Sequence, residues 1–319
     1  MKLKQLECIT TIVRCGFNIS QAANVLHTTQ PGVSAQLRLL EEELGNRIFV
    51  RNGKRITGLT PAGEVIALLA EETLLKTEAI RQVSEELKHE DRGTLTIATT
   101  HTQARYALPD AITRFMREFP KVQLHIDQGN PEEVAQMVVK GGADLAIATE
   151  AIGKHEELLM LPVYRWNRCV VATPGHPVFT QQPLTLEGIA RFPLITYSAT
   201  FTGREAMNKV FAERGLNPEI VLTAIDSDVI KHYVGLGLGV GVLARMAYDP
   251  AQDTHLQSAD VGHLFPDNVT GIAIRRGRFL RHYMYRFIEI FAPHLNRKFI
   301  ESAQEEGAVN MAGVVLRTL

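Results

Sequence analysis

The chain lacks the features that mark several large classes of protein. Its 319 residues include one tryptophan and three cysteines, and the cysteines form no C-x-x-C pair. A small and odd number of cysteines fits a reducing compartment and argues against a fold held together by disulfides. No apolar run approaches the roughly 18 residues of a membrane span. The first residues, MKLKQLECITTIV, also lack the long apolar segment and cleavage site of a secretory leader. These absences predict a cytoplasmic protein that has no membrane partner.

Sequence patterns of common enzymes and metal sites are also absent. There is no G-x-S-x-G, no H-E-x-x-H and no phosphate-binding P-loop, and the eleven histidines show no metal-ligand spacing. The glycines of GLGLGVGVL follow a helical pattern, whereas a dinucleotide-binding site needs them before the helix. We therefore expect no catalytic residues, no metal and no cofactor. A solute-binding protein is a further alternative, which the missing leader opposes.

The distribution of charge is uneven along the chain. The formal net charge is −1, but residues 1–60 hold eight lysines and arginines against four glutamates, a surplus of +4. The remaining residues therefore carry a surplus of −5. The length suggests two or three domains. A basic N-terminal segment on an acidic body predicts a polyanionic partner for that segment alone.

The first 45 residues show the pattern of a helix-turn-helix. Apolar residues recur at helical spacing over residues 3–13, and Asn18 or Ser20 is placed to cap a second helix. A third helix should have Pro31 in its first turn and end at Gly45. Two short helices, a tight turn and a longer helix form this motif. The buried stripe expected on the third helix is Val33, Leu37, Leu40 and Leu44. The side chains expected to face DNA are Thr29, Gln30, Pro31, Ser34, Gln36 and Arg38.

A basic hairpin follows the third helix. The segment IFVRNGKRITGLT contains two strand-like runs around Asn52-Gly53, which is a strong hairpin signal. The tip carries Arg51, Lys54 and Arg55, which we expect to contact the phosphate backbone or the minor groove. The alternative is a three-helix structural module with a solvated loop.

Residues 1–63, especially ISQAANVLHTTQPGVSAQLRLLEEELGNRIFVRNGKRITGLTPAG, closely resemble the DNA-binding domain of the LysR-type transcriptional regulators. The resemblance implies a winged helix-turn-helix domain over residues 1–60 that binds double-stranded promoter DNA. It also implies homodimers or homotetramers, contact with RNA polymerase, and a C-terminal effector domain similar to the periplasmic binding proteins.

A connecting helix is expected between the two parts. Residues 61–89 contain no helix breaker, and apolar residues recur in alternating steps of four and three. Such a helix would be about 43 Å long and would protrude from a small domain. The resemblance implies that this linker, residues 61–91, forms a dimer; the alternative is packing on its own effector domain. The residues expected at the dimer contact are Ile66, Leu69, Ile80 and Val83.

The remainder alternates short apolar strands with amphipathic helices, which predicts an α/β fold with largely parallel sheets. The resemblance implies an effector domain over residues 92–295 with two α/β subdomains. Subdomain I would comprise about 92–162 and 268–295, and subdomain II about 163–267. The tail, residues 296–319, carries no functional interpretation.

Hydroxyl and amide side chains gather in the segment IATTHTQARYALP, where a strand gives way to a helix. Ligands of open α/β sheets bind at the carboxyl ends of strands, and the start of a helix favours an anion. Neutral donors converging there suit a small oxyanion, although helix capping is the simpler role for each threonine alone.

The segments TTHTQARYALP, GGADLAIATEA, LPVYRWNRCVVATPGHP, FTGRE and GLGLGVGVLA resemble the CysB subgroup of LysR-type regulators. This resemblance implies an activator of sulfur assimilation and cysteine biosynthesis genes, with sulfate, thiosulfate or O- or N-acetylserine as effector. For Trp166, filling the core is an equal alternative. A LysR-type regulator of another pathway, with a carboxylate or aromatic effector, also stays open. The effector residues implied are Thr100, Thr102, Gln103, Thr149, Trp166 and Thr202.

Overall fold

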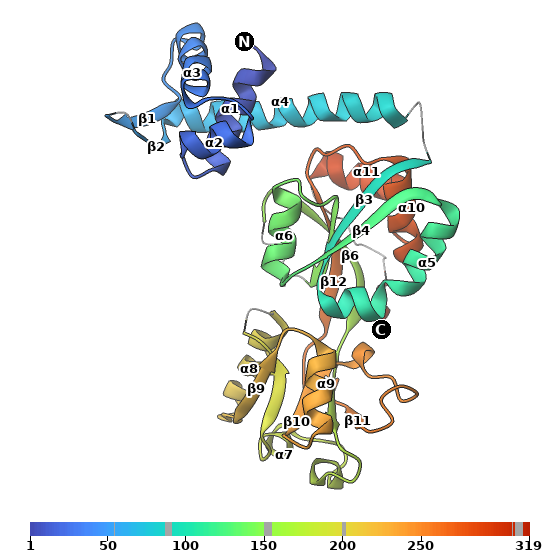
Figure 1. Cartoon of the computed structure of the whole chain (residues 1–319). Helices are drawn as coiled ribbons and strands as arrows, with labels where there is room; N and C mark the ends of the chain where they lie inside the picture. The colour runs from blue at the N-terminus through green and yellow to red at the C-terminus, as the bar shows by residue number, and fades with distance from the viewer. Residues whose placement is uncertain (54, 87–90, 150–154, 200–201, 308, 310–314) are drawn as a thin grey trace. The chain divides into compact units, whose positions relative to one another are not determined.

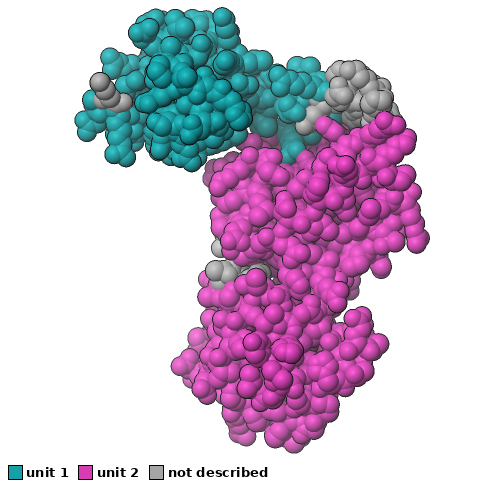
Figure 2. All heavy atoms as spheres, in the orientation of Figure 1, with its two compact units in different colours: residues 1–88, 277–279 teal, residues 89–276, 280–319 magenta. Residues whose placement is uncertain are grey.

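Three helices open the chain in the computed structural model (Figure 1). The structure describes all residues except 54, 87–90, 150–154, 200–201, 308 and 310–314, and only the backbone of 79, 82–86 and 202–203. It divides into one unit of residues 1–88 with 277–279 and another of residues 89–276 with 280–319 (Figure 2). Each unit has a hydrophobic core of its own.

The helix-turn-helix forms where the sequence predicts it. Its helices are α1 (Leu3–Arg14), α2 (Ile19–Val25) and α3 (Gln30–Leu44). The Asn18 side chain caps α2 by accepting from the backbone N–H of Gln21, and Thr29 caps α3 in the same way. Gly45 ends α3 with a φ of 67°, a conformation that glycine adopts without strain. The expected cap at Asn18, one of the two candidates, and the expected helix end at Gly45 are confirmed, whereas the Thr29 cap was not predicted.

The expected buried stripe of α3 holds over most of its length. Val33, Leu37 and Leu40 are buried in the core of the first unit, but Leu44 is exposed. Leu44 is the last residue of α3, and the chain turns away at Gly45, so its side chain leaves the core. The prediction for Leu44 was therefore wrong.

The hairpin and the long helix complete the first unit. Strands β1 (Phe49–Asn52) and β2 (Arg55–Leu59) pair antiparallel, with Asn52 opposite Arg55. The long helix α4 (Pro61–Glu86) packs against α1, where its Ala70 is buried. An ion pair of 2.9 Å between Arg14 and Glu71 joins the same two helices.

The second unit contains two mixed sheets, each with helices of its own. The first half has a six-stranded sheet in the order β13-β6-β12-β5-β3-β4. Its strands are β3 (Arg92–Thr99), β4 (Lys121–Gln128), β5 (Leu145–Thr149), β6 (Leu158–Trp166), β12 (Asn268–Arg275) and β13 (Arg317–Thr318). Its helices are η1 (Gln103–Ala107), α5 (Pro109–Glu118), α6 (Pro131–Val139), α10 (His282–Phe291) and α11 (Arg297–Glu306). Strands β4, β3 and β5 run parallel, whereas β12 is antiparallel to β5 and β6.

The second half has a five-stranded sheet in the order β11-β7-β10-β8-β9. Its strands are β7 (Arg168–Ala172), β8 (Leu194–Tyr197), β9 (Ile220–Ala224), β10 (Val240–Ala244) and β11 (Gln257–Asp260). Its helices are η3 (Pro177–Thr180), α7 (Leu186–Ile189), α8 (Thr202–Glu213), α9 (Ser227–Gly235) and η4 (Arg245–Ala247). The chain enters this half at Asn167, because β6 continues past residue 162, and it returns to the first half at Asn268.

The tail is ordered secondary structure, which the sequence had not indicated. Helix α11 buries Ile300 and Ala303 in the core of the first half. Strand β13 pairs in parallel with β6 and becomes an edge of the six-stranded sheet. Helix α11 and strand β13 are therefore part of the first half, and residues 308 and 310–314 are not among the described residues.

The expected helix after β3 is divided into two segments. Residues Gln103–Ala107 form one turn of π-helix, and α5 begins at Pro109. Proline lacks a backbone N–H, so the helical hydrogen-bond pattern is interrupted at Pro109, although Leu108 keeps a helical conformation with φ −86° and ψ −24°. Short π-helical turns are frequent at functional sites.

Candidate DNA-binding surface and effector site

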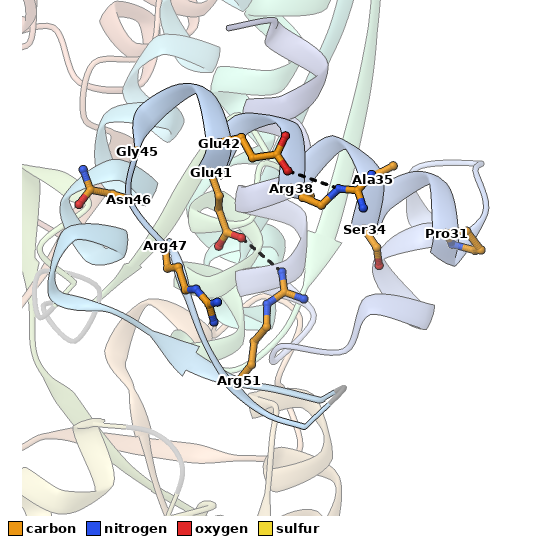
Figure 3. A pocket seen from close by; sticks show the side chains of 10 residues that line it. All are labelled: Pro31, Ser34, Ala35, Arg38, Glu41, Glu42, Gly45, Asn46, Arg47 and Arg51. Carbon is orange, nitrogen blue, oxygen red and sulfur yellow. Dashed lines mark hydrogen bonds and ion pairs between the residues drawn. The ribbon is translucent and has the colours of Figure 1, made fainter.

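An open groove of about 880 Å³ lies between α3 and the start of the hairpin (Figure 3). Pro31, Ser34 and Arg38 line it from α3. Arg47 lines it from the segment before β1, and Arg51 lines it from β1 itself. Arginines and hydroxyls on a hollow surface of the basic N-terminal segment suit contacts with phosphates and base edges.

Two arginines of this groove form ion pairs with glutamates of α3. Arg38 lies 3.7 Å from Glu42, and Arg51 lies 3.5 Å from Glu41 (Figure 3). Exposed pairs of this kind contribute little stability, so a phosphate can replace the carboxylate of Glu42 at low cost. Glu41 is less exposed and also accepts the backbone N–H of Ile48 at 2.8 Å. Arg51 therefore also fixes the hairpin against α3.

A second hollow of about 520 Å³ lies between the start of α2, Gln30 at the start of α3, and the start of β2. Gln30 and Arg55 line it together with Asn18, Ser20 and Gln21 from the start of α2. The Ser20 hydroxyl donates to the Gln30 side chain at 3.4 Å. The polar side chains of α2 in this hollow were not among the sequence predictions.

Two of the remaining predicted DNA contacts are not in these grooves. Ser34 lines the groove of Figure 3, and Gln36 lies two positions after it. Residues two positions apart on a helix point to different sides, so the Gln36 side chain does not enter this groove. Thr29 is exposed, and its side chain caps α3. Lys54 lies outside the described residues.

The predicted effector residues after β3 are buried at the junction of the two halves of the second unit. Thr100, Thr102 and Gln103 are all buried. The Thr102 Oγ1 lies 3.4 Å from the Ser227 Oγ, at the first residue of α9. Ser227 Oγ in turn lies 2.7 Å from the Tyr197 hydroxyl. Thr102 therefore heads a chain of hydroxyls that crosses from one half to the other.

Sequence reasoning missed Ser227 and Tyr197. Ser227 follows Asp226, whose side chain caps α9 by accepting from the Val229 N–H at 2.7 Å. The pair Asp226-Ser227 before an amphipathic run is a helix-start signal, and it was available in the sequence. Tyr197 ends β8 and accepts the backbone N–H of Ala244 at 3.2 Å. No local pattern indicated that this tyrosine would meet Ser227.

Gln103, Thr149 and Trp166 converge on one residue of β12. The Gln103 Nε2 donates to the Thr270 hydroxyl at 3.3 Å, and the Trp166 Nε1 donates to the same oxygen at 3.1 Å. Thr149 is the strand partner of Thr270. Trp166 is only 6% exposed and belongs to the core of the first half, so it fills the core and joins this polar cluster.

The last predicted effector residue, Thr202, is the first residue of α8. Its side chain lies outside the described part of the chain. Nearby, the Arg204 side chain donates to the Tyr197 backbone oxygen at 3.1 Å. Burial lowers the pKa of the Arg204 guanidinium.

A charged cluster centred on Asp228 also joins the two halves. The Tyr106 hydroxyl, on the π-helical turn, donates to Asp228 at 2.5 Å. Arg105 lies 3.6 Å from the same carboxylate, and Lys231 lies 3.4 Å from it. Burial raises the pKa of Tyr106 to about 12, and the bond to Asp228 adds to the rise. Burial tends to raise the pKa of Asp228, but Tyr106 and Lys231 outweigh it, so the pKa is lowered.

The expected dimer residues of α4 differ in their surroundings. Ile66 is half-buried against the core of its own unit, because α4 packs on α1. Leu69 is 54% exposed and Ile80 is 71% exposed, and the side chain of Val83 is not described. Val65 and Leu68 are also exposed. Among the described side chains of α4, the large apolar ones that are exposed are therefore Val65, Leu68, Leu69 and Ile80.

Neither a metal site nor a membrane span is found among the described residues. Among the described residues, no group of three or more histidine, cysteine, aspartate or glutamate side chains is arranged to hold a metal ion. Within the same residues, no helix combines the length and the apolar character that crossing a membrane requires.

Two family models match the chain. Residues 3–64 match the bacterial regulatory helix-turn-helix proteins of the lysR family, and residues 88–296 match the LysR substrate binding domain. The HTH-type transcriptional regulator SsuR of Burkholderia cenocepacia is 49% identical over 306 residues, covering 96% of this chain and 99% of that protein. The HTH-type transcriptional regulator CysB of the same organism is 49% identical over 303 residues, covering 95% and 97%.

A solved structure is similar to the second unit. The cofactor-binding domain of the Cbl transcriptional regulator superposes with a TM-score of 0.65 at 42% identity, covering 67% of this chain and 94% of that one. These similarities confirm the predicted fold, a winged helix-turn-helix followed by an α/β effector domain.

Proposed function

Because the chain belongs to the LysR family of bacterial regulators, we propose that it controls genes of sulfur assimilation and cysteine biosynthesis in response to a small oxyanion. It is a DNA-binding transcriptional regulator, as its relatives are, and not an enzyme. The similarity to regulators named CysB and Cbl supports the choice of pathway.

The observation that carries the proposed effector is the chain of hydroxyls from Thr102 through Ser227 to Tyr197. Its members come from both halves of the second unit, and Ser227 is the first residue of α9, the helix end whose dipole favours an anion. Neutral hydroxyl donors bind a fully ionised oxyanion without a proton transfer. We infer that sulfate, thiosulfate or O- or N-acetylserine binds there, between Thr100, Thr102, Gln103 and Thr149 and the second half.

Titration calorimetry of the full-length chain tests this proposal. Sulfate, thiosulfate and both acetylserines are titrated in parallel with benzoate and succinate. Binding of at least one sulfur-pathway compound, with no heat from benzoate or succinate, is the expected result. A protein that binds none of the sulfur compounds would show that the proposed effector class is wrong.

A carboxylate effector is the second candidate, and Arg204 favours it. Its guanidinium donates to the backbone oxygen of Tyr197, the residue whose hydroxyl ends the chain. A carboxylate is recognised well by the planar fork of an arginine. Tight binding of succinate or benzoate in the same titrations would select this candidate.

The proposed DNA contacts are the side chains of the two grooves. Ser34, Arg38 and Arg51 would act from the groove of Figure 3, and Gln30 and Arg55 from the second hollow. Thr29, Pro31, Gln36 and Lys54 complete the proposed surface. A gel shift with the promoter region upstream of the protein's own coding sequence tests whether this surface binds DNA specifically.

Assembly is proposed through the exposed apolar residues of α4. A regulator with one small DNA-binding domain gains specificity when two copies bind paired half-sites, so we propose a homodimer or homotetramer. Contact with RNA polymerase at the promoter and residence in the cytoplasm follow from the proposed role as an activator.

A further inference from the structure

Strand β13 joins the tail to the six-stranded sheet of the first half by pairing with β6. Its Arg317 lies opposite Tyr164 of β6, and Thr318 lies opposite Arg165. The backbone N–H of Leu319 continues the pairing by donating to the Arg165 carbonyl at 2.9 Å. These pairs fix the position of the tail along β6, the strand that carries Tyr164.

The Arg317 side chain contacts the Tyr164 ring directly and also indirectly, through Phe291. Its guanidinium carbon lies 5.5 Å from the centre of the Tyr164 ring and 5.8 Å from that of Phe291. One guanidinium nitrogen donates to the Phe291 carbonyl at 3.2 Å. The two rings meet edge to face, with their centres 6.1 Å apart. Cation–ring and ring–ring contacts of this geometry are attractive, so Arg317 and Phe291 together fix the plane of the tyrosine.

Tyr164 reaches from this contact to a predicted effector residue. Its ring is fully buried, and its hydroxyl donates to the Oε1 of Gln103. The Nε2 of Gln103 then donates to the Thr270 hydroxyl, which also accepts from Trp166. A side-chain amide has one accepting end and one donating end. A donor at Oε1 and an acceptor at Nε2 therefore select one of its two orientations.

We propose that Arg317 is a positioning residue of the effector site, which holds Tyr164 so that its hydroxyl orients the amide of Gln103. The inference rests on the proposed function, because it takes Gln103 to be an effector contact. The proposal gives the tail a role, because Arg317 on β13 would orient side chains of a site that is formed mainly by residues near Thr100. The Tyr164 hydroxyl keeps its proton and acts as a donor, since burial raises its pKa strongly against the smaller effects of Thr270 and Arg317.

The competing interpretation is that Arg317 only stabilises the packing of the tail against the sheet and does not affect the effector site. The chain offers a matched control for it. Arg297, at the start of α11, lies 4.9 Å from the ring centre of Tyr285 and donates to Glu301 on its own helix. Arg297→Ala therefore removes one arginine–tyrosine contact from the same half without acting on the site.

The test compares full-length Arg317→Ala, Tyr164→Phe, the double variant and Arg297→Ala by two readouts. The first is the dissociation constant for thiosulfate and sulfate, measured by calorimetry. The second is the emission of Trp166, the sole tryptophan, which reports on the Thr270 cluster without any ligand. Melting temperatures are recorded so that loss of stability is separated from loss of site geometry.

Arg317→Ala and Tyr164→Phe should each weaken anion binding about three- to tenfold, and the double variant should be no worse than Tyr164→Phe, because the two residues act in series. Both should shift the Trp166 emission, and Arg297→Ala should change neither readout. Unchanged affinity and emission in Arg317→Ala, with only a lower melting temperature, would overturn the proposal. If the parent binds neither anion, the proposed effector fails, and the Trp166 emission alone decides the role of Arg317.

Discussion

The Thr102 hydroxyl lies 3.4 Å from that of Ser227, although 125 positions separate them in the sequence. One residue follows a strand of the first half, and the other begins a helix of the second half. A ligand that accepts hydrogen bonds from both would hold the two halves together. This relationship makes Thr102 the most informative position for testing the effector site.

Thr102→Val keeps the shape of the side chain and removes its hydroxyl. A lost hydrogen bond to a charged ligand costs about 1.5–3 kcal/mol, which corresponds to a roughly ten- to hundredfold weaker affinity. We expect that loss for the sulfur compound that binds the parent, measured by calorimetry. Operator binding without effector should persist, since the DNA-binding residues are unchanged.

Thr223→Val is the matched control for this prediction. It makes the same chemical change at an exposed position of β9, away from β3. It should bind the effector as the parent does. Equal affinities for the parent and Thr102→Val would remove Thr102 from the effector site.

The Asp228 cluster predicts an acid-dependent stability. The folded-state pKa of Asp228 is lowered from its ordinary 3.8, so its contribution is fully present above pH 3.8 and is lost as the pH falls through the folded value. Asp228→Asn removes the negative charge that accepts the hydrogen bond of Tyr106 and forms an ion pair with Lys231. The Asp228 side chain is 42% exposed, so solvent screens these interactions. We therefore expect a loss of at most about 1 kcal/mol, which corresponds to a melting temperature up to about 2–4 °C lower at pH 7.

The same difference should shrink as the pH approaches and passes below 3.8, because the parent then also loses the charge. Thermal melting of both proteins from pH 7 down to the lowest pH at which they fold measures this convergence. Asp127→Asn, at an exposed position of β4, is the control. A constant gap at every pH would mean that Asp228 acts through packing and not through its charge.

The sequence predicted most of the features that depend on short-range signals. Asn18 and Gly45 mark helix ends by side-chain capping and by left-handed backbone geometry, so a few neighbouring residues define them. The position of Thr102 after a strand was likewise predictable, because the carboxyl ends of parallel strands gather at one edge.

The contacts that the sequence did not predict join distant segments. Tyr197 meets Ser227, and Arg317 meets Tyr164, only after two sheets and the tail have folded. No periodicity encodes such pairs. The exposure of Leu44 depends in the same way on where the chain turns after α3.

Arg55→Ala should weaken DNA binding in a sequence-independent way. Arg55 lines the second hollow of the DNA-binding surface, and a phosphate contact there releases about one counterion. The slope of log affinity against log salt should therefore fall by up to about one unit, measured by fluorescence anisotropy on operator and random DNA. Arg14→Ala, which removes a charge paired with Glu71, is the control and should leave the slope unchanged.

Gln30→Ala should instead reduce sequence preference. A glutamine that makes a bidentate contact with a base contributes about 1–3 kcal/mol of discrimination. Affinity for the operator should fall while affinity for random DNA stays constant, in the same anisotropy assay. An equal loss on both DNAs would reassign Gln30 to the phosphate backbone.

Leu69→Glu should disrupt the proposed dimer. Leu69 is 54% exposed on α4, beside the exposed Val65 and Leu68, and such a stripe is stable in water when a second copy covers it. A buried leucine contributes about 1.5–3 kcal/mol, and a symmetric contact contains it twice. An unpaired buried glutamate costs more than the lost leucine. We therefore expect the dimer dissociation constant to rise at least about a hundredfold, measured by analytical ultracentrifugation.

Leu39→Glu separates loss of the dimer contact from a general effect of charge. Leu39 is 50% exposed on α3, so the substitution places the same carboxylate at a similarly exposed leucine outside α4. This variant should sediment as the parent does. If Leu69→Glu also kept the parent's association state, α4 would not be the contact, because two facing carboxylates would repel each other across any symmetric interface that includes this residue.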